Sequence, residues 1–232
     1  MIQTVAVVVP ANDEAPRIER CLRAIADALA ASPLAPDRCH LVVVADDCRD
    51  ATAALARARG AHVLEVAHRS VGAARATGMR YALGRSGAHP AHEIWLATTD
   101  ADSVVPRRWL TAQLGYAAAG WDAVVGTVAV ADWSRRPPGL AEAFARQYDA
   151  HREEHPHVHG ANLGVRASAY LDVGGFAPLA RAEDHALVAG LGARGHRIRR
   201  PVDLPVRTSA RSAPRAPGGF GDRLTDIAAG IG

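Results

Sequence analysis

The side chains with the clearest chemical potential are two aspartates that follow an apolar segment. Asp100 and Asp102 lie in LATTDADSVVP, residues 96–106. Two carboxylates this close repel each other unless a cation compensates them. Mg²⁺ or Mn²⁺ suits such a site because these ions take carboxylate and phosphate oxygens as ligands. The same aspartates could instead form a helix cap and a turn, so their position in the fold decides between the two interpretations.

The first half of the chain alternates strand-like and helix-like patterns. Continuous β-branched runs indicate buried strands, and apolar residues at helical spacing indicate helices between them. Such alternation predicts an α/β fold with a mostly parallel, Rossmann-like sheet flanked by helices. The expected strands are 5–9, 41–44, 62–66 and 93–97, and the expected helices are 18–29, 52–59 and 70–83.

Polar clusters follow three of these strands, at residues 10–14, 46–50 and 99–102. Ligands of parallel sheets collect at the carboxyl ends of the strands, so the three clusters should meet at one edge. This convergence favours cation binding by the aspartate pair over a simple cap. Asp46 could accept hydrogen bonds from a nucleotide base or ribose at the same edge.

The second half is less regular, and the boundary between the halves falls near Ser103. From residue 209 onward the chain is rich in Arg, Pro and Gly, which predicts a loop followed by a tail over residues 213–232. The expected helices are 109–119, 139–153 and 184–194, and the expected strands, in a mixed sheet, are 123–130 and 197–200. Residues 159–176 predict a strand, a short helix and a turn at Gly174 and Gly175.

Composition excludes several classes of protein. No segment reaches the roughly 20 consecutive apolar residues of a membrane span, and no signal peptide is evident. Three cysteines without paired spacing predict a reduced, cytoplasmic setting. All 27 basic residues are arginines, dispersed along the chain, and aromatic residues make up only 5%, so nucleic-acid binding is not expected. Neither a GxGxxG nor a Walker A motif is present.

Three further side chains could take part in chemistry. Arg75 could brace the acid cluster or a diphosphate, or it could be an ordinary surface arginine. Glu183 and Asp184 precede an apolar helical run, HALVAGL. Acids at this place either stabilise the helix N-terminus or supply a general base.

A competing motif lies at residues 151–155. The sequence HREEH matches H-x-x-E-H, an inverted zinc-protease signature when it lies on a helix. Pro156 closes such a helix at once, and Glu183 is only a loose candidate for the further ligand, so a metallopeptidase is the weaker interpretation. His159 lies beside residues 160–162, a candidate site-lining loop.

Five segments, taken in order, resemble the motifs of family 2 glycosyltransferases with a GT-A fold. They are VAVVVPANDE, VVVADDCRDAT, SVGAARATGMRYAL, ATTDADS, and VGGF followed by AEDHALVAGL, between Val5 and Arg200. The resemblance implies one catalytic domain over residues 1–212, with a nucleotide-sugar-binding half, 1–102, and an acceptor-binding half, 103–212. It also implies inverting transfer of a sugar from a UDP- or GDP-sugar to an acceptor hydroxyl, with Mg²⁺ or Mn²⁺ at a DxD motif.

The resemblance implies roles for individual residues as well. Asp184 would be the catalytic base. Asp102, together with Asp100, would bind the metal. The nucleotide-sugar pocket would include Pro10, Asn12, Glu14, Asp46, Arg75 and Asp100, and the acceptor side would include Trp133, His159, Asn162 and Glu183.

The sequence departs from the family pattern in some places. The second motif, commonly DDGSTDGT, is ADDCRDAT here, which leaves the nucleotide base and the donor sugar open. The Q-x-x-R-W motif of processive synthases is absent, which favours a single-transfer enzyme. A third metal ligand is not identified, with His185 and His196 as options. Two alternatives remain: a non-catalytic nucleotide-sugar-binding protein on the same fold, and a nucleotidyltransferase.

Overall fold

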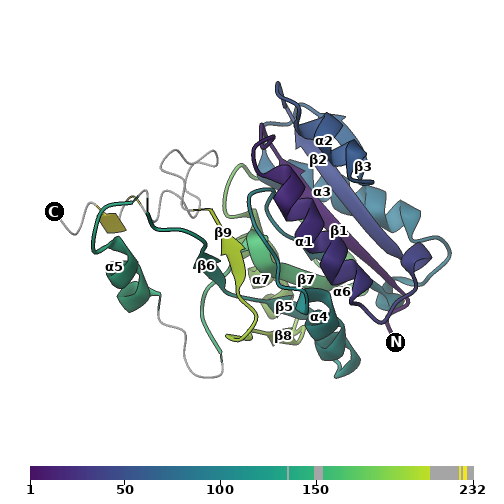
Figure 1. Ribbon diagram of the computed structural model, residues 1–232. Coiled ribbons are helices and arrows are strands. Elements are labelled where there is room, and N and C mark those ends of the chain that lie inside the picture. Colours follow the sequence, from purple (N-terminus) through teal and green to yellow (C-terminus); the bar gives the residue numbers. More distant parts are fainter. Residues whose placement is uncertain (135, 149–153, 210–224, 226, 229–232) are drawn as a thin grey trace.

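The computed structural model describes residues 1–134, 136–148, 154–209, 225 and 227–228. Its strands are β1 (Thr4–Ala11), β2 (Cys39–Asp46), β3 (His62–Val66), β4 (Ile94–Thr98), β5 (Ala123–Val125), β6 (Val128–Val130), β7 (Leu163–Arg166), β8 (Ile198–Arg199) and β9 (Val206–Thr208). Seven of these strands form one central sheet, in the order β3-β2-β1-β4-β7-β5-β8 (Figure 1).

All strands of this sheet except β7 run in the same direction. The strands β3, β2, β1 and β4 run parallel to one another. β7 runs antiparallel to both β4 and β5, and β8 is parallel to β5. The mostly parallel sheet confirms the predicted α/β fold class, and strands from both halves of the chain take part in it.

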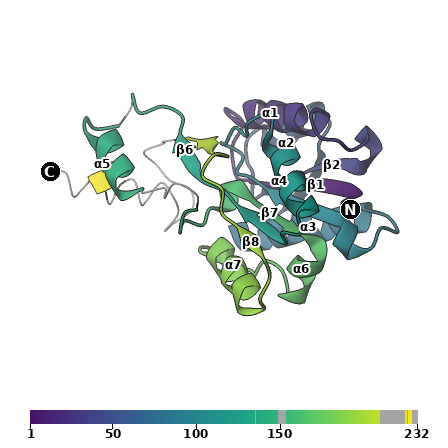
Figure 2. The same ribbon diagram turned by 90° about the horizontal axis from the view of Figure 1, so that it is seen from below.

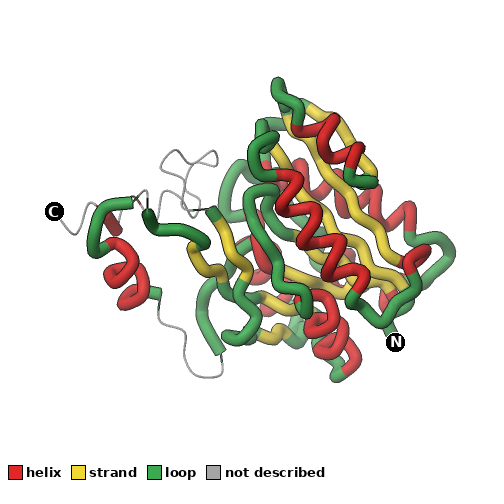
Figure 3. The backbone as a smooth tube through the Cα atoms, viewed as in Figure 1, coloured by secondary structure: helices red, strands yellow, loops and turns green. Residues whose placement is uncertain are grey.

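Helices cover both faces of the sheet (Figures 2 and 3). α1, α2 and α4 pack on one face, and α3, α6 and α7 pack on the other. No helix among the described residues is long and apolar enough to cross a membrane. The helices are α1 (Ile18–Ala30), α2 (Thr52–Ala58), α3 (Val71–Arg85), α4 (Trp109–Ala118), α5 (Leu140–Gln147), α6 (Ala167–Asp172) and α7 (Glu183–Ala193).

The central strand β1 is apolar throughout because both of its faces are covered. Val5, Val7 and Val9 belong to the core beneath α1 and α4. Ala6 and Val8 belong to the core beneath α3. This alternation is the period of two that a strand imposes on its side chains.

Helix α3 approaches the sheet closely because it has a glycine at the contact. A Cβ atom at Gly78 would lie 2.3 Å from Cγ1 of Val8 and 2.9 Å from Cγ2 of Val44. The absence of a side chain therefore allows α3 to pack directly onto β1 and β2. The close approach also fixes Arg75, which lies about one turn earlier in the same helix.

The expected strand 123–130 is divided into β5 and β6, which belong to different sheets. β6 pairs with β9 in a separate two-stranded parallel sheet. The break occurs at Gly126, against which the side chain of Asn162 lies, and the backbone N–H of Gly126 donates to the Asn162 carbonyl at 2.9 Å. The continuous apolar pattern of residues 123–130 could not reveal that the strand divides, because β9, the partner of β6, comes from a distant part of the chain.

The segment 126–162 leaves the sheet and returns to it at the same edge. Its ends meet because Val125 of β5 is the register partner of Leu163 of β7. Helix α5 belongs to this segment and lies apart from the main body, with its own small apolar cluster (Figure 1). The helix was expected over 139–153 and ends at Gln147, while residues 149–153 lie outside the described part.

Candidate active site

The predicted site residues gather at one edge of the sheet. The segments that follow β1, β2 and β4 reach this edge because those strands are parallel. β7 runs the other way, so it is the segment before it, including His159 and Gly160, that reaches the same edge. The reversal explains how the second half of the chain adds to a site built on the first.

Backbone strain is concentrated around this edge. Within the described chain, four residues other than glycine have positive φ: Asp13, Asp47, Arg69 and Ala182. The first three follow the ends of β1, β2 and β3, and Ala182 precedes α7. Such conformations are costly for residues with a Cβ and occur frequently at binding and catalytic sites, which makes this edge the candidate site on backbone geometry alone.

Asp46 is buried at the end of β2 and holds the loop that precedes α3. Its carboxylate accepts the backbone N–H groups of His68 at 2.6 Å, Arg69 at 2.9 Å and Ser70 at 3.0 Å. Ser70 in turn caps α3, accepting the N–H of Ala73. Asp46 therefore holds the backbone of this loop in place. Its contact with a nucleotide base stays a prediction.

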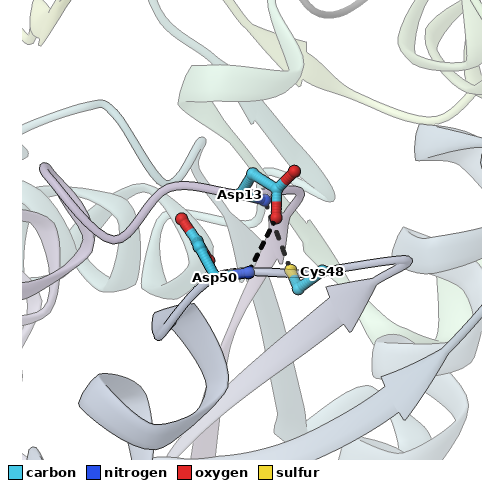
Figure 4. Close-up of side chains that lie close together, drawn as sticks. All are labelled: Asp13, Cys48 and Asp50. Carbon is cyan, nitrogen blue, oxygen red and sulfur yellow. Dashed lines mark hydrogen bonds between the residues drawn. The ribbon is translucent and has the colours of Figure 1, made fainter.

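The loops after β1 and β2 hold each other through two aspartates (Figure 4). Asp13 Oδ1 accepts the N–H groups of Arg49 at 2.6 Å and Asp50 at 3.2 Å. In return, Asp50 Oδ2 accepts the N–H of Ala15 at 3.0 Å, and Oδ1 accepts the N–H of Thr52 at 2.9 Å. We call this reciprocal pair, Asp13 and Asp50, the loop clasp.

Cys48 lies beside the loop clasp, and the three side chains offer ligand atoms within 4.8 Å of one another. Hydrogen bonding explains the group without a metal. Burial raises the pKa of the Cys48 thiol, and the thiol donates to the Ala11 carbonyl while its sulfur accepts the N–H of Asp13. Because these ligand atoms already bond the backbone, we interpret the group as a structural clasp.

Three of the residues that were expected in the nucleotide pocket lie next to the clasp. Asn12 donates from Nδ2 to the carbonyls of Asp46 at 2.7 Å and Asp47 at 3.3 Å. Glu14 is buried, and its backbone N–H donates to Thr52 Oγ1 at 2.7 Å. Pro10, partly buried, belongs to β1. All three therefore lie at the site edge.

Arg75 connects the aspartate pair to the acids of α7. Its guanidinium donates to Asp100 Oδ1 at 2.6 Å through Nη2 and to Glu183 Oε1 through Nη1. Arg75 and Glu183 are each only 3% exposed. The guanidinium passes over Gly160, where a Cβ atom would lie 2.4 Å from Nη1. Arg75 is thus a buried link between three segments of the site.

Asp184, the predicted base, is partly exposed at the start of α7. Its Oδ2 accepts the backbone N–H of Gly160 at 2.7 Å, and its Oδ1 accepts the N–H of His185 at 2.8 Å. The N-terminus of a helix also favours a negative charge. These contacts orient the Asp184 carboxylate, which lies next to the Arg75 network.

Asp102 lies against the second, two-stranded sheet. Ser103 Oγ and Thr208 Oγ1 are 3.5 Å and 3.4 Å from Asp102 Oδ1, and Ser103 Oγ donates to Thr208 Oγ1 at 3.0 Å. Antiparallel bridging of Val104 with Arg207 holds the same loop to β9. The C-terminal part of the chain therefore positions the aspartate pair.

A third metal ligand does not join the aspartate pair within the described residues. His196, one of the options, bonds Asp172 at 3.0 Å, beyond the far end of α7. His185 is exposed in the first turn of α7. Mg²⁺ often needs only one or two carboxylates, with waters and substrate phosphates completing its shell.

The family of the chain follows from comparison with known proteins. Residues 6–174 match the model of the family described as "Glycosyl transferase family 2". The chain belongs to glycosyl transferase family 2. A comparison with curated proteins found no match.

Solved structures of glycosyltransferases share the fold. A mannosyltransferase from Pyrobaculum calidifontis, in complex with GDP-Man and Mn²⁺, has a TM-score of 0.67 at 22% identity, over 93% of this chain and 59% of that one. S. aureus TarS, in complex with UDP-GlcNAc, has a TM-score of 0.68 at 15% identity, over 98% and 66%. Glucosyl-3-phosphoglycerate synthase from Mycobacterium tuberculosis, in complex with Mn²⁺, UDP and glucosyl-3-phosphoglycerate, has a TM-score of 0.56 at 18% identity, over 98% and 76%. These similarities confirm the predicted GT-A fold, and this chain spans about three fifths to three quarters of the three structures.

A column of rings contains two of the residues that were predicted on the acceptor side. Tyr148, at the end of α5, stacks on His157 with centroids 4.1 Å apart, and its hydroxyl lies 2.9 Å from His159 Nε2. Trp133 meets Phe144 at 5.5 Å in the same column. The predicted residues Trp133 and His159 therefore belong to the same column of rings. Tyr148 was missed because a single aromatic at the end of an amphipathic helix gives no signal of a contact across a loop.

Asn162 is fully buried beneath these rings, and its place on the acceptor side stays a prediction. Its amide donates to the carbonyls of Thr127 at 2.8 Å and Leu204 at 2.7 Å, and accepts from Trp109 Nε1 at 2.8 Å. Glu183, expected on the same side, is likewise buried against Arg75.

The competing zinc-protease motif does not form a helical site in the described residues. Glu154 and His155 lie in an extended segment, and Glu154 pairs with Arg199 at 2.9 Å. His151 lies outside the described part.

Proposed function

We propose that this family 2 member transfers a sugar from a UDP- or GDP-sugar to an acceptor hydroxyl, with inversion at the anomeric carbon. The observation that carries the proposal is the link through Arg75, which places Asp100 and the acids of α7 at one edge of the sheet. The nucleotides and Mn²⁺ in the similar structures support the same choice of donor and metal.

The aspartate pair suits a divalent cation. Asp100 and Asp102 offer carboxylate oxygens, which Mg²⁺ and Mn²⁺ prefer, and the Asp100 side chain is 39% exposed. When bound, such a cation stabilises the diphosphate leaving group by neutralising its charge. Asn12, Glu14 and Asp46 would line the nucleotide on the neighbouring loops.

Asp184 would remove the proton from the attacking acceptor hydroxyl. A general base must be ionised and lie within hydrogen-bond reach of the proton it takes. Its contact with the Gly160 N–H fixes one carboxylate oxygen and stabilises the negative charge. The acceptor oxygen would then attack from the side opposite the diphosphate, which gives inversion in one step.

The test measures release of nucleoside diphosphate from UDP- and GDP-sugars in the presence of Mn²⁺. We expect Asp184→Asn to bind donor normally and to lose at least about 100-fold in turnover. Asp102→Ala should lose the Mn²⁺ dependence of donor binding. Asp37→Asn, which changes an exposed acid distant in sequence from the site, is the matched control.

Two results would contradict the proposal. Turnover that neither Asp102→Ala nor Asp184→Asn reduces would mean that the metal ligand and the base are wrongly assigned. A wild-type protein that binds donor and Mn²⁺ without any transfer or hydrolysis would instead be a non-catalytic nucleotide-sugar-binding protein.

A further inference from the structure

Arg75 is placed to hold protein groups and not to touch a substrate. Its side chain is 4% exposed, and its two terminal nitrogens donate to carboxylates from different segments. Asp100 follows β4, and Glu183 is the first residue of α7. The Phe176 ring lies near the guanidinium, with its centroid 5.8 Å from Cζ. The rigid planar fork of arginine fixes the directions of two partners at once, whereas the ammonium of lysine is a compact charge with rotatable donors.

The position of Asp184 depends on the same fork. Glu183 and Asp184 are adjacent in the first turn of α7, so holding one of them in place orients the other. Gly160, whose N–H bonds Asp184, lies directly against Arg75. Movement of the guanidinium would therefore disturb both the helix that carries Asp184 and the amide that binds it.

The charge of Arg75 also opposes a cation at the aspartate pair. Arg75 is bonded directly to Asp100, so its positive charge and a divalent cation would share one carboxylate. Like charges at this separation repel. Arg75 should therefore weaken metal binding while it improves the geometry for the reaction.

We propose that Arg75 is a positioning residue that couples the aspartate pair to Asp184, at the cost of metal affinity. The inference rests on the proposed function and adds to it. It predicts opposite effects on two measurements when Arg75 is removed: tighter Mn²⁺ binding and slower transfer. A residue that merely supports the fold would weaken both.

Two variants separate the charge of Arg75 from its shape. Arg75→Met combined with Glu183→Gln removes both buried charges, so neither is left without its partner. Because Arg75 bonds Asp100 directly and Glu183 does not, loss of the Arg75 charge outweighs loss of the Glu183 charge, and we expect Mn²⁺ to bind about three- to tenfold more tightly, by calorimetry. Arg75→Lys keeps the charge and should bind Mn²⁺ as the wild type does. Both variants should lose about 100-fold in kcat with little change in donor KM. Arg80→Met, on the exposed side of α3, is the control.

Amide hydrogen exchange tests the positioning step without metal or donor. We expect the Gly160 amide to exchange at least about tenfold faster in both Arg75 variants, with the Val7 amide of the central strand unchanged. Unchanged exchange at Gly160, weaker Mn²⁺ binding by the double variant, or a raised donor KM with normal kcat would each overturn the inference. A wild type without turnover on any donor would overturn the proposed function, while the exchange result would still decide whether Arg75 holds Asp184.

Discussion

Glu183 and Asp184 are adjacent acids at the start of one helix, and their surroundings differ completely. Consecutive residues of a helix point about 100° apart, so two neighbours can lie in different surroundings. Glu183 faces inward and pairs with Arg75, whereas Asp184 is partly exposed and accepts the N–H of Gly160. The division of roles between a positioning acid and a base follows from this rotation.

His155 is the buried residue whose protonation should control stability. The residue is 2% exposed, and both of its ring nitrogens are buried. Burial lowers the pKa of His155 to about 4, with the charges of His157 and Arg200 acting in the same direction. The folded protein therefore holds this imidazole neutral at pH values where the unfolded chain protonates it.

We predict that the free energy of unfolding falls as the pH drops below 6.5. The unfolded state then binds a proton that the folded state excludes, which costs about 2 kcal/mol between pH 7.5 and pH 5. Urea unfolding at the two pH values measures the change. His155→Leu should show a smaller decrease by about that amount, whereas His92→Ala, at an exposed position, should behave as the wild type does. Equal decreases in His155→Leu and the wild type would show that another group is responsible.

The positions of some site residues could be predicted from the sequence, and the contacts of others could not. The converging acids Asp46, Asp100 and Asp102 could be predicted because their place after a strand is visible in the pattern. That Asn162 is buried, or that Asp46 bonds three backbone amides, depends on long-range partners. A motif gives the position of a side chain along the chain and not the direction in which it points.

Among the elements, α3 makes several of the contacts that hold the candidate site together. It packs on β1 and β2 through Gly78, carries Arg75, and begins at the loop that Asp46 holds. Gly72, in its first turn, lies so close to the backbone that a Cβ atom there would be 2.3 Å from the Ala177 carbonyl oxygen. Small displacements of this helix therefore reach the aspartate pair and α7 together.

Two glycines of α3 provide a matched test of this packing. Gly78→Ala should destabilise the protein by about 1–3 kcal/mol, because the new methyl group meets two buried valines. Gly84→Ala, in the same helix, meets nothing within 4 Å and should stabilise it by about 0.5–1 kcal/mol through helix propensity. Urea unfolding of both variants measures the difference, and two stabilised variants would refute the close contact.

The elements of the first half were expected nearly as they occur, because each strand and helix has its own periodic pattern. In the second half, the strand expected at 123–130 was two strands in different sheets. Short strands whose partners are distant give a weak local signal. The reversal of β7, which brings residues 159–160 to the site, is a property of topology that no local pattern contains.

At the scale of the molecule, the site is assembled from loops of both halves, so ligand binding should stabilise the whole fold. Binding to the folded state alone adds about 2.7 kcal/mol at a ligand concentration 100-fold above Kd. For a chain of this length we expect Tm to rise by about 5–10 °C with UDP or GDP and Mn²⁺. Asp102→Ala should lose the part that depends on Mn²⁺. A shift that is equal with and without Mn²⁺ would argue against metal-assisted nucleotide binding.

The register pairing of Val125 with Leu163 has a consequence for how such proteins can diversify. Because the segment 126–162 begins and ends on neighbouring strands, its length is not set by the distance it must span. The part between β6 and Gly160, residues 131–159, can be lengthened, shortened or replaced while β5 and β7 keep their pairing and the Gly160 N–H still bonds Asp184. Trp133, Tyr148 and His159 all belong to it, so we expect acceptor preference to behave as an exchangeable module, inherited or grafted separately from the donor half.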